Sequence, residues 1–135
     1  MFMARTFILL AAVFGFLGVA LGAFAAHGLA AQFEANPGSE ETFRTATQYQ
    51  MIHALALLGI GILLTMEAQH AVPLPARMLQ RAGYCFAAGI VLFSGSLYLL
   101  SVFNLRFMGV IAPLGGLALL AGWLCLGLVG RNVTE

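Results

Sequence analysis

Four long apolar runs constrain this chain more than any other feature of its sequence. A helix that crosses the hydrocarbon core of a bilayer needs roughly 20 mostly apolar residues. Four stretches meet this requirement, at about residues 6–26, 47–66, 82–103 and 107–129. Because lipid cannot hydrogen-bond to an exposed backbone, each run must be helical. The sequence therefore predicts an all-α integral membrane bundle of four transmembrane helices with antiparallel neighbours, forming a single domain over residues 1–135.

The composition agrees with this class and excludes others. Hydrophobic residues make up 61% of the chain and charged residues 8%, whereas a soluble domain has about 25% charged residues. The charged side chains are six arginines and five glutamates, with a net charge of +1. This distribution gives no basic patch or stripe of the kind that binds nucleic acid. The expected partner is therefore the lipid bilayer.

The first apolar run has a second interpretation as a signal peptide. Arg5 is followed by TFILLAAVFGFLGVALGAFA, in which Ala23-Phe24-Ala25 is similar to a cleavage site. The run is longer than a typical signal core, however, and continues into AAHGL rather than into a polar segment. The sequence favours an uncleaved first span.

Arginine positions predict the orientation in the membrane. With four spans, both termini and the middle loop lie on one side. That side carries Arg5, Arg77, Arg81 and Arg131, and the opposite side carries Arg44 and Arg106. The positive-inside rule then places both termini in the cytoplasm. On the outer side, ANPGSEE predicts a turn followed by Ser39 as the N-cap of a helix that begins before the membrane.

Unusual polar residues converge on the outer half of the predicted bundle. His53 lies six residues after Thr47, about 9 Å deeper at 1.5 Å per residue. Tyr49 and Gln50 precede His53 by four and three residues, so they share its helix face. The candidate ligand-binding residues are His27, Tyr49, Gln50, His53, Ser94, Ser96 and Tyr98. We expect a polar intramembrane pocket centred on His53, since an ionisable residue at membrane depth is a functional hypothesis by default.

The alternative is that these residues only join helices. An interhelical hydrogen bond in a membrane contributes about 0.6 kcal/mol on average. The sequence slightly favours this interpretation for the cluster as a whole, and His27 at the end of its span also suits the headgroup layer.

Small residues spaced along two of the spans predict close helix packing. They are Gly18, Gly22, Gly115, Gly116, Ala118 and Gly122. Small side chains let helix backbones approach one another in membranes. The sequence favours packing within the chain, and a homo-oligomer remains the alternative.

Other kinds of site find little support. Cys85 and Cys125 are isolated and form no Cys-x-x-Cys pair, which favours packing roles over redox chemistry. The three histidines are far apart in sequence, so no metal site is predicted. No cofactor is expected. Because no nucleophile and base stand at a recognisable spacing, a non-enzymatic protein is favoured over an enzyme.

Four segments taken in order resemble a known family. They are GAFAAHGL (22–29), TATQYQMIHALALL (45–58), LFSGSLYLL (92–100) and IAPLGGLALLAGW (111–123). As a set they resemble the small bacterial membrane proteins of domain of unknown function 423, which are related to animal transmembrane protein 256. Ala25 and Ala112 depart from the family pattern, which usually has glycine and threonine there. The resemblance implies a bacterial inner (plasma) membrane protein with about four spans, and it implies no particular activity.

Three functional hypotheses follow. The leading one is binding of a lipid or another amphipathic small molecule in the pocket around His53. The second is a small transporter or permease in which His53 titrates near neutral pH. The third is a structural subunit of a larger membrane complex, packed through Gly18 and Gly22.

Overall fold

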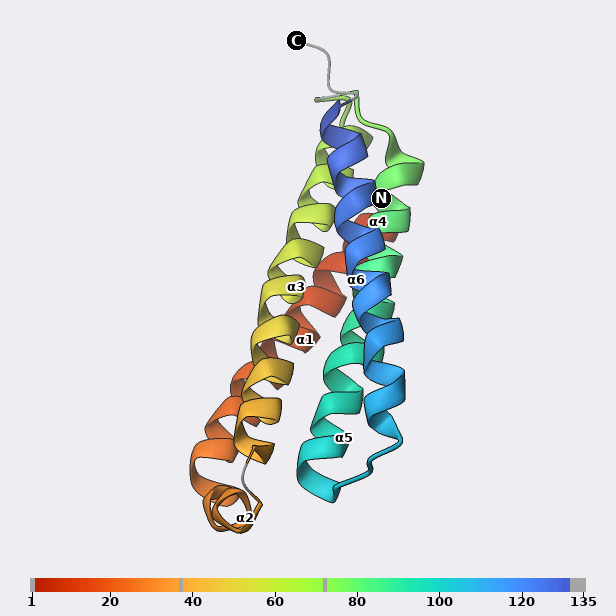
Figure 1. Ribbon diagram of the computed structural model, residues 1–135. Helices are drawn as coiled ribbons and strands as arrows, with labels where there is room; N and C mark the ends of the chain where they lie inside the picture. Colours follow the sequence, from red (N-terminus) through yellow and green to blue (C-terminus); the bar gives the residue numbers. More distant parts are fainter. Residues whose placement is uncertain (1, 37, 72, 132–135) are drawn as a thin grey trace.

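Four long helices run side by side in alternating directions in the computed structural model (Figure 1). The structure describes residues 2–36, 38–71 and 73–131, and this part of the chain contains no strand. The long helices are α1 (Phe2–Gly28), α3 (Ser39–Ala68), the composite third span α4 (Ala76–Gly89), η1 (Ile90–Ser94) and α5 (Gly95–Phe103), and α6 (Met108–Arg131). All four are long and apolar enough to cross a membrane. The predicted all-α fold with four membrane-length helices is confirmed.

The ends of the helices differ in detail from the prediction. A short helix, α2 (Ala30–Ala35), connects α1 to α3 at the end opposite the chain termini (Figure 1). The predicted cap at Ser39 is wrong by one residue, because the N-cap is Gly38 with a φ of 90°. This left-handed conformation suits glycine, which has no Cβ to clash. Ser39 is instead the first helical residue, and its hydroxyl donates back to the Asn36 carbonyl at 2.7 Å.

A π-helical turn interrupts the third span. It covers Ile90–Ser94 and separates α4 from α5. Here the neighbouring helix α6 comes very close: a Cβ added to Gly115 would lie 2.3 Å from the backbone nitrogen of Phe93. Gly115 therefore allows the two backbones to touch at the widened turn. The sequence did not predict this turn, although π-bulges often occur at functional sites.

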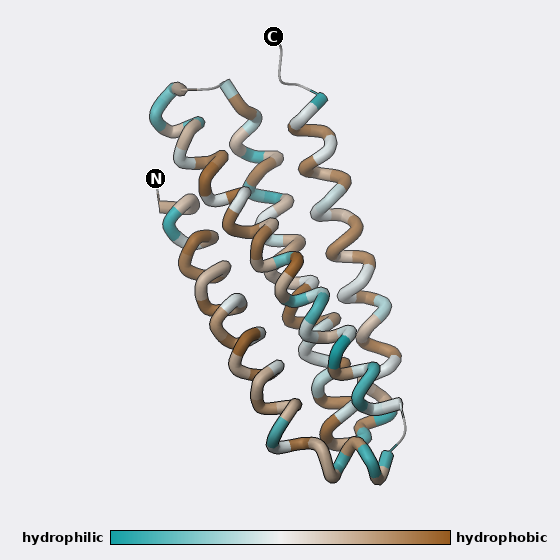
Figure 2. The backbone as a smooth tube through the Cα atoms, turned by 90° about the vertical axis from the view of Figure 1, so that its left-hand side faces the viewer, coloured by the Kyte–Doolittle hydropathy of each residue, from teal (hydrophilic) through white to brown (hydrophobic). Residues whose placement is uncertain are grey.

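The main cluster of buried apolar side chains surrounds the middle of α3 and its end nearer the termini. Its fully buried apolar side chains come from α1, α3 and α4, and they are Phe7, Leu57, Ile60, Leu79 and Phe86. Large apolar side chains also cover the outside, for example Leu55, Val110 and Leu120. Figure 2 shows apolar positions along most of each long helix and hydrophilic positions concentrated toward the two ends. Such a surface matches a lipid environment rather than water.

Alanine substitutions at two adjacent glycines test the close approach of α6 to the third span. In Gly115→Ala the new methyl group would clash with the backbone of Phe93, whereas the equivalent atom at Gly116 would lie at an ordinary 3.8 Å from the Phe93 ring. Since overpacking typically costs about 1–3 kcal/mol, we expect Gly115→Ala to lower the thermal unfolding temperature in detergent. The matched Gly116→Ala variant should unfold close to the wild type. Equal unfolding temperatures for the two variants would contradict the close contact.

Candidate functional site

Two separate hydrogen-bonded clusters begin from the same stretch of α3. Gln50 and His53 are 3% and 4% exposed, one turn apart on its buried face. A buried polar group costs free energy unless it finds a partner. Each of these side chains finds partners on different helices, so α3 is the element that organises the polar interior.

The Gln50 cluster joins three helices. The side-chain amide nitrogen of Gln50 donates to the Phe14 carbonyl of α1 at 2.7 Å. The Tyr98 hydroxyl of α5 donates to Gln50 Oε1 at 2.9 Å and lies 3.2 Å from Thr47 Oγ1. Thr47 in turn donates to the carbonyl of Phe43, whose ring packs 4.8 Å from that of Tyr98. These polar groups bond to one another, and the cluster holds α1, α3 and α5 together.

The His53 cluster joins α3 to α6. The Trp123 indole nitrogen donates to His53 Nε2 at 3.0 Å, and His53 Nδ1 lies 2.7 Å from the Tyr49 carbonyl oxygen. Indole has only a donor, so Nε2 must be the acceptor, and the ring proton must sit on Nδ1 and bond to the carbonyl. This arrangement assigns a neutral imidazole. Protonation of Nε2 would leave two N–H donors, that of His53 and that of the Trp123 indole, facing each other without an acceptor.

A groove of about 640 Å³ opens beside this pair, about halfway along α3. Its lining is mainly apolar and comes from α3, η1 and α6: Tyr49, Ile52, His53, Phe93, Pro113, Gly116, Leu117, Leu119, Leu120 and Trp123. The Tyr49 ring packs 4.7 Å from the Phe93 ring, and its hydroxyl has no hydrogen-bond partner in the described part of the chain. The groove thus combines apolar walls with one unpaired phenol and the His53–Trp123 pair.

The remaining predicted ligand-binding residues lie elsewhere. Ser94 is 1% exposed, and its hydroxyl has no partner among the residues that the structure describes. Ser96 donates to the Phe93 carbonyl at 2.9 Å. His27 is exposed, and its Nδ1 lies 3.1 Å from the Ala23 carbonyl oxygen in its own helix. The residues expected to share one pocket are therefore divided. Tyr49 and His53 line the groove, and Gln50 and Tyr98 bond helices together. Ser94, Ser96 and His27 do neither.

Sequence reasoning missed Trp123, the partner of His53. It is the single tryptophan of the chain and lies eight residues before the end of α6, about 12 Å inside the helix at 1.5 Å per residue. Membrane tryptophans gather at the interface, so one this far inside a span signals an N–H group that needs a buried partner. The position of Trp123 could be read from the sequence, but only the packed structure shows that His53 is its hydrogen-bond partner.

The predicted packing residues meet neighbours within the chain to different degrees. Added Cβ atoms would lie 2.5 Å from Met51 Sδ at Gly18 and 3.6 Å from the Thr47 methyl carbon at Gly22, both on α3. Gly122 lies against the Phe86 ring, where an added Cβ would be 2.6 Å away, and Ala118 is half-buried.

No group of three metal-ligating side chains gathers in the described ranges. Cys85 and Cys125 are both free thiols and half-buried.

The fold and these contacts define a four-helix integral membrane protein in which Gln50 and His53 bond to other helices and whose surface carries a mainly apolar groove. Comparison with known proteins assigns the family. The family model "Protein of unknown function (DUF423)" matches residues 21–116, and the chain belongs to this family. The resemblance stated from the sequence motifs is confirmed.

Curated relatives match nearly the whole chain. The UPF0382 membrane protein YwdK of Bacillus subtilis (strain 168) is 40% identical over 121 residues, covering 89% of this chain and 91% of the relative. The UPF0382 inner membrane protein YgdD of Escherichia coli (strain K12) is 38% identical over 129 residues, covering 94% and 89%. The UPF0382 membrane protein SSP2132 of Staphylococcus saprophyticus is 38% identical over 122 residues, covering 90% and 93%. No solved structure matches the chain.

The Gln50–Tyr98 bond can be measured with a double-mutant cycle. Tyr98→Phe removes the hydroxyl and leaves Gln50 Oε1 without its closest donor. Interhelical hydrogen bonds in membranes contribute about 0.6 kcal/mol on average and up to about 1.7, so we expect a coupling free energy in this range between Tyr98→Phe and Gln50→Leu. Reversible unfolding in mixed micelles gives the four stabilities. The exposed Tyr84→Phe serves as a control for loss of a hydroxyl, and it should show no coupling to Gln50→Leu. Additive effects of Tyr98→Phe and Gln50→Leu would contradict the assigned bond.

Proposed function

We propose that this protein binds a lipid or a lipid-like amphipathic molecule in the groove between α3 and α6. The observation that carries the proposal is the unpaired Tyr49 hydroxyl at an otherwise apolar groove beside the His53–Trp123 pair. The site differs in character from the polar pocket expected from the sequence, because most of its lining is aliphatic or aromatic. His53 takes part as a fixed wall of the groove and as the acceptor that orients Trp123.

The dimensions and lining suit such a ligand. Ligand sites generally enclose about 300–1,000 Å³ and place a few polar groups in a mainly apolar lining. A groove of about 640 Å³ falls within this range. Leu117 and Leu120 offer contact to an acyl chain or an apolar ring, and the Tyr49 hydroxyl offers one hydrogen bond. The ligand that fits is an apolar chain or ring carrying an oxygen such as a carboxyl, ester or ketone group.

The contacts of His53 favour binding over proton-linked transport. A proton carrier needs a nitrogen that is free to gain and lose a proton during the cycle. Both His53 ring nitrogens already have partners, Trp123 on one side and the Tyr49 carbonyl on the other. Protonation would break the bond to Trp123, so the ring suits a structural and ligand-contacting role.

Trp123 gives a direct test, because it is the single tryptophan and it lines the groove. We expect a fatty acid brominated in mid-chain to quench its fluorescence in a saturable manner in micelles. Gly116→Leu places a side chain in the groove and should weaken the saturable phase at least tenfold. Tyr49→Phe removes one hydrogen bond, which contributes about 0.5–1.5 kcal/mol, and should weaken binding about two- to tenfold.

The matched control is Gly127→Leu, at an exposed glycine of the same helix with nothing within 4 Å of an added Cβ. It lies outside the groove lining and should bind the brominated fatty acid as the wild type does. Quenching that rises without saturation in the wild type, or that is equally weakened by both glycine variants, would overturn the proposal.

We also propose that the protein lies in the bacterial plasma membrane with both termini in the cytoplasm. Arginine positions support this orientation: the termini end of the molecule carries Arg5 on α1, Arg77 and Arg81 on α4, and Arg131 on α6. The opposite end carries Arg44 and Arg106. An excess of arginine marks the cytoplasmic side of inner-membrane proteins.

Cysteine labelling tests the orientation. With Cys85 and Cys125 replaced by alanine, Glu34→Cys reports the α2 end and Gln69→Cys reports the termini end; both positions are exposed. We expect a membrane-impermeant maleimide to label Glu34→Cys in intact spheroplasts and Gln69→Cys only after lysis. The reverse pattern would show the opposite orientation.

A further inference from the structure

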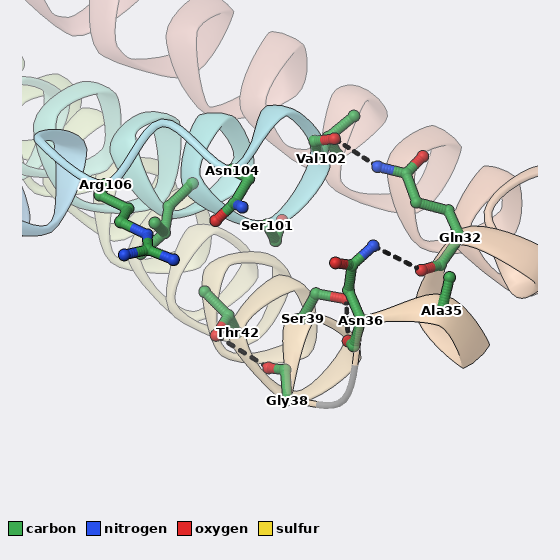
Figure 3. Close-up of a pocket in the computed structure, with 11 residues that line it drawn as sticks. Gln32, Ala35, Asn36, Gly38, Ser39, Thr42, Ser101, Val102, Asn104 and Arg106 are labelled. Atoms are coloured by element: carbon green, nitrogen blue, oxygen red, sulfur yellow. Dashed lines mark hydrogen bonds between the residues drawn. The ribbon is translucent and has the colours of Figure 1, made fainter.

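A second cavity lies at the end of the molecule opposite the termini, away from the groove. It has a volume of about 510 Å³ and is lined by residues of two walls. One wall is formed by α2 and the start of α3, and the other by the end of α5 and the turn into α6 (Figure 3). The lining residues are Gln32, Ala35, Asn36, Gly38, Ser39, Thr42, Leu100, Ser101, Val102, Asn104 and Arg106. In contrast to the groove, most of these residues are polar.

One side-chain hydrogen bond joins the two walls, and a second lies within the α2 wall. The Gln32 amide nitrogen donates to the Val102 carbonyl across the cavity (Figure 3). The side-chain amide nitrogen of Asn36 donates to the backbone carbonyl of Gln32 at 3.2 Å. Left-handed backbone conformations at Gly38, with φ 90°, and Asn104, with φ 52°, turn the chain at the two walls. These bonds and turns belong to the chain itself and shape both walls of the cavity.

The cavity offers mainly hydrogen-bond acceptors. Its three hydroxyls each donate to a backbone carbonyl: Ser39 to Asn36 at 2.7 Å, Thr42 to Gly38 at 3.0 Å, and Ser101 to Tyr98 at 3.1 Å. A hydroxyl has a single proton, so each of these oxygens has only lone pairs left for a ligand. The cavity consequently suits a ligand part that donates hydrogen bonds.

Arg106 supplies the only positive charge among the lining residues. Its guanidinium has no hydrogen bond or ion pair to any other residue that the structure describes. Glu34 and Glu40 at this end of the molecule line a different, smaller cavity. An unpaired guanidinium carries five donors in a planar fork that matches phosphate. This edge of the cavity therefore suits an anion.

The neighbours of Arg106 are of the kind expected at the membrane surface. The end of α5 and the turn into α6 expose three large apolar side chains, Phe103, Leu105 and Phe107. Aromatic and apolar side chains at the ends of membrane helices lie at the level of the headgroups. Arg106 lies between Leu105 and Phe107 in the chain, where we expect the guanidinium to reach the level of the lipid phosphates.

We propose that this cavity binds the headgroup of a phospholipid from the adjoining leaflet. The phosphodiester pairs with Arg106, and the hydroxyl or ammonium donors of the headgroup bond to the acceptor oxygens of Ser39, Thr42 and Ser101. This site is separate from the groove between α3 and α6 and does not depend on it. The chemistry gives a selectivity: phosphatidylglycerol and phosphatidylethanolamine carry donors, whereas phosphatidylcholine has none.

Native mass spectrometry from micelles tests this selectivity. The protein is mixed with equimolar phosphatidylglycerol, phosphatidylethanolamine and phosphatidylcholine with identical acyl chains. We expect adducts of the first two to exceed phosphatidylcholine adducts several-fold. Arg106→Gln should reduce all three adducts several-fold, because each headgroup has the phosphodiester. Thr42→Val keeps the shape of the side chain but removes an acceptor, and it should lower the preference over phosphatidylcholine.

Controls separate this site from general charge effects and from the groove. Arg44→Gln removes the other arginine at this end, which is exposed and does not line the cavity, and it should leave the adducts unchanged. Gly116→Leu should also leave the headgroup preference unchanged, which distinguishes the two proposals. Equal adducts of all three lipids in the wild type, or equal losses in the two arginine variants, would overturn the inference. Displacement of the lipids by millimolar sn-glycerol 3-phosphate would assign the site to a soluble anion and would overturn the lipid assignment.

Discussion

The need of buried polar groups for partners inside a lipid environment organises this structure. Water is absent from the hydrocarbon core, so a buried amide or imidazole must bond to another helix. Gln50 and His53 meet this need in different directions, Gln50 toward α1 and α5 and His53 toward α6. One turn of α3 is thereby connected to all the other long helices, and a core of apolar side chains packs along α3 beside it.

Close backbone approach is the second requirement, and it shapes the neighbourhood of the groove. Gly115 brings α6 onto the π-helical turn of the third span, where its missing side chain leaves room for the Phe93 backbone. The same contact positions Phe93 as a wall of the groove and holds Trp123 of α6 within reach of His53. The packing of α6 on the third span and the shape of the candidate site thus both depend on Gly115. A larger residue at Gly115 would move α6 and with it the tryptophan that bonds to His53.

The two cavities differ in chemistry because they lie at different depths. The groove beside His53 lies about halfway along α3 and has aliphatic and aromatic walls with few polar atoms. The cavity at Arg106 lies where the helices end, and backbone turns at Gly38 and Asn104 bring hydroxyls, amides and a cation together. A phospholipid has the same division between an apolar chain and a polar headgroup. The two proposed sites would therefore match the two parts of a phospholipid, and they can be varied independently.

The sequence by itself determined the class of fold, the approximate spans and the family, because apolar runs of sufficient length have only one stable form in lipid. It also indicated that Gln50, His53 and Tyr98 need partners, since polar groups at membrane depth rarely lack them. Only the tertiary structure decided which partners they have: Tyr98 bonds to Gln50, whereas His53 bonds to Trp123, and His27 lies apart. Periodicity gives the face of each helix, but the rotation and distance between helices depend on side-chain packing between segments far apart in the chain. The π-helical turn and the groove arise from that packing, and the single polar pocket expected from the sequence became a bonded interior cluster and a mainly apolar groove.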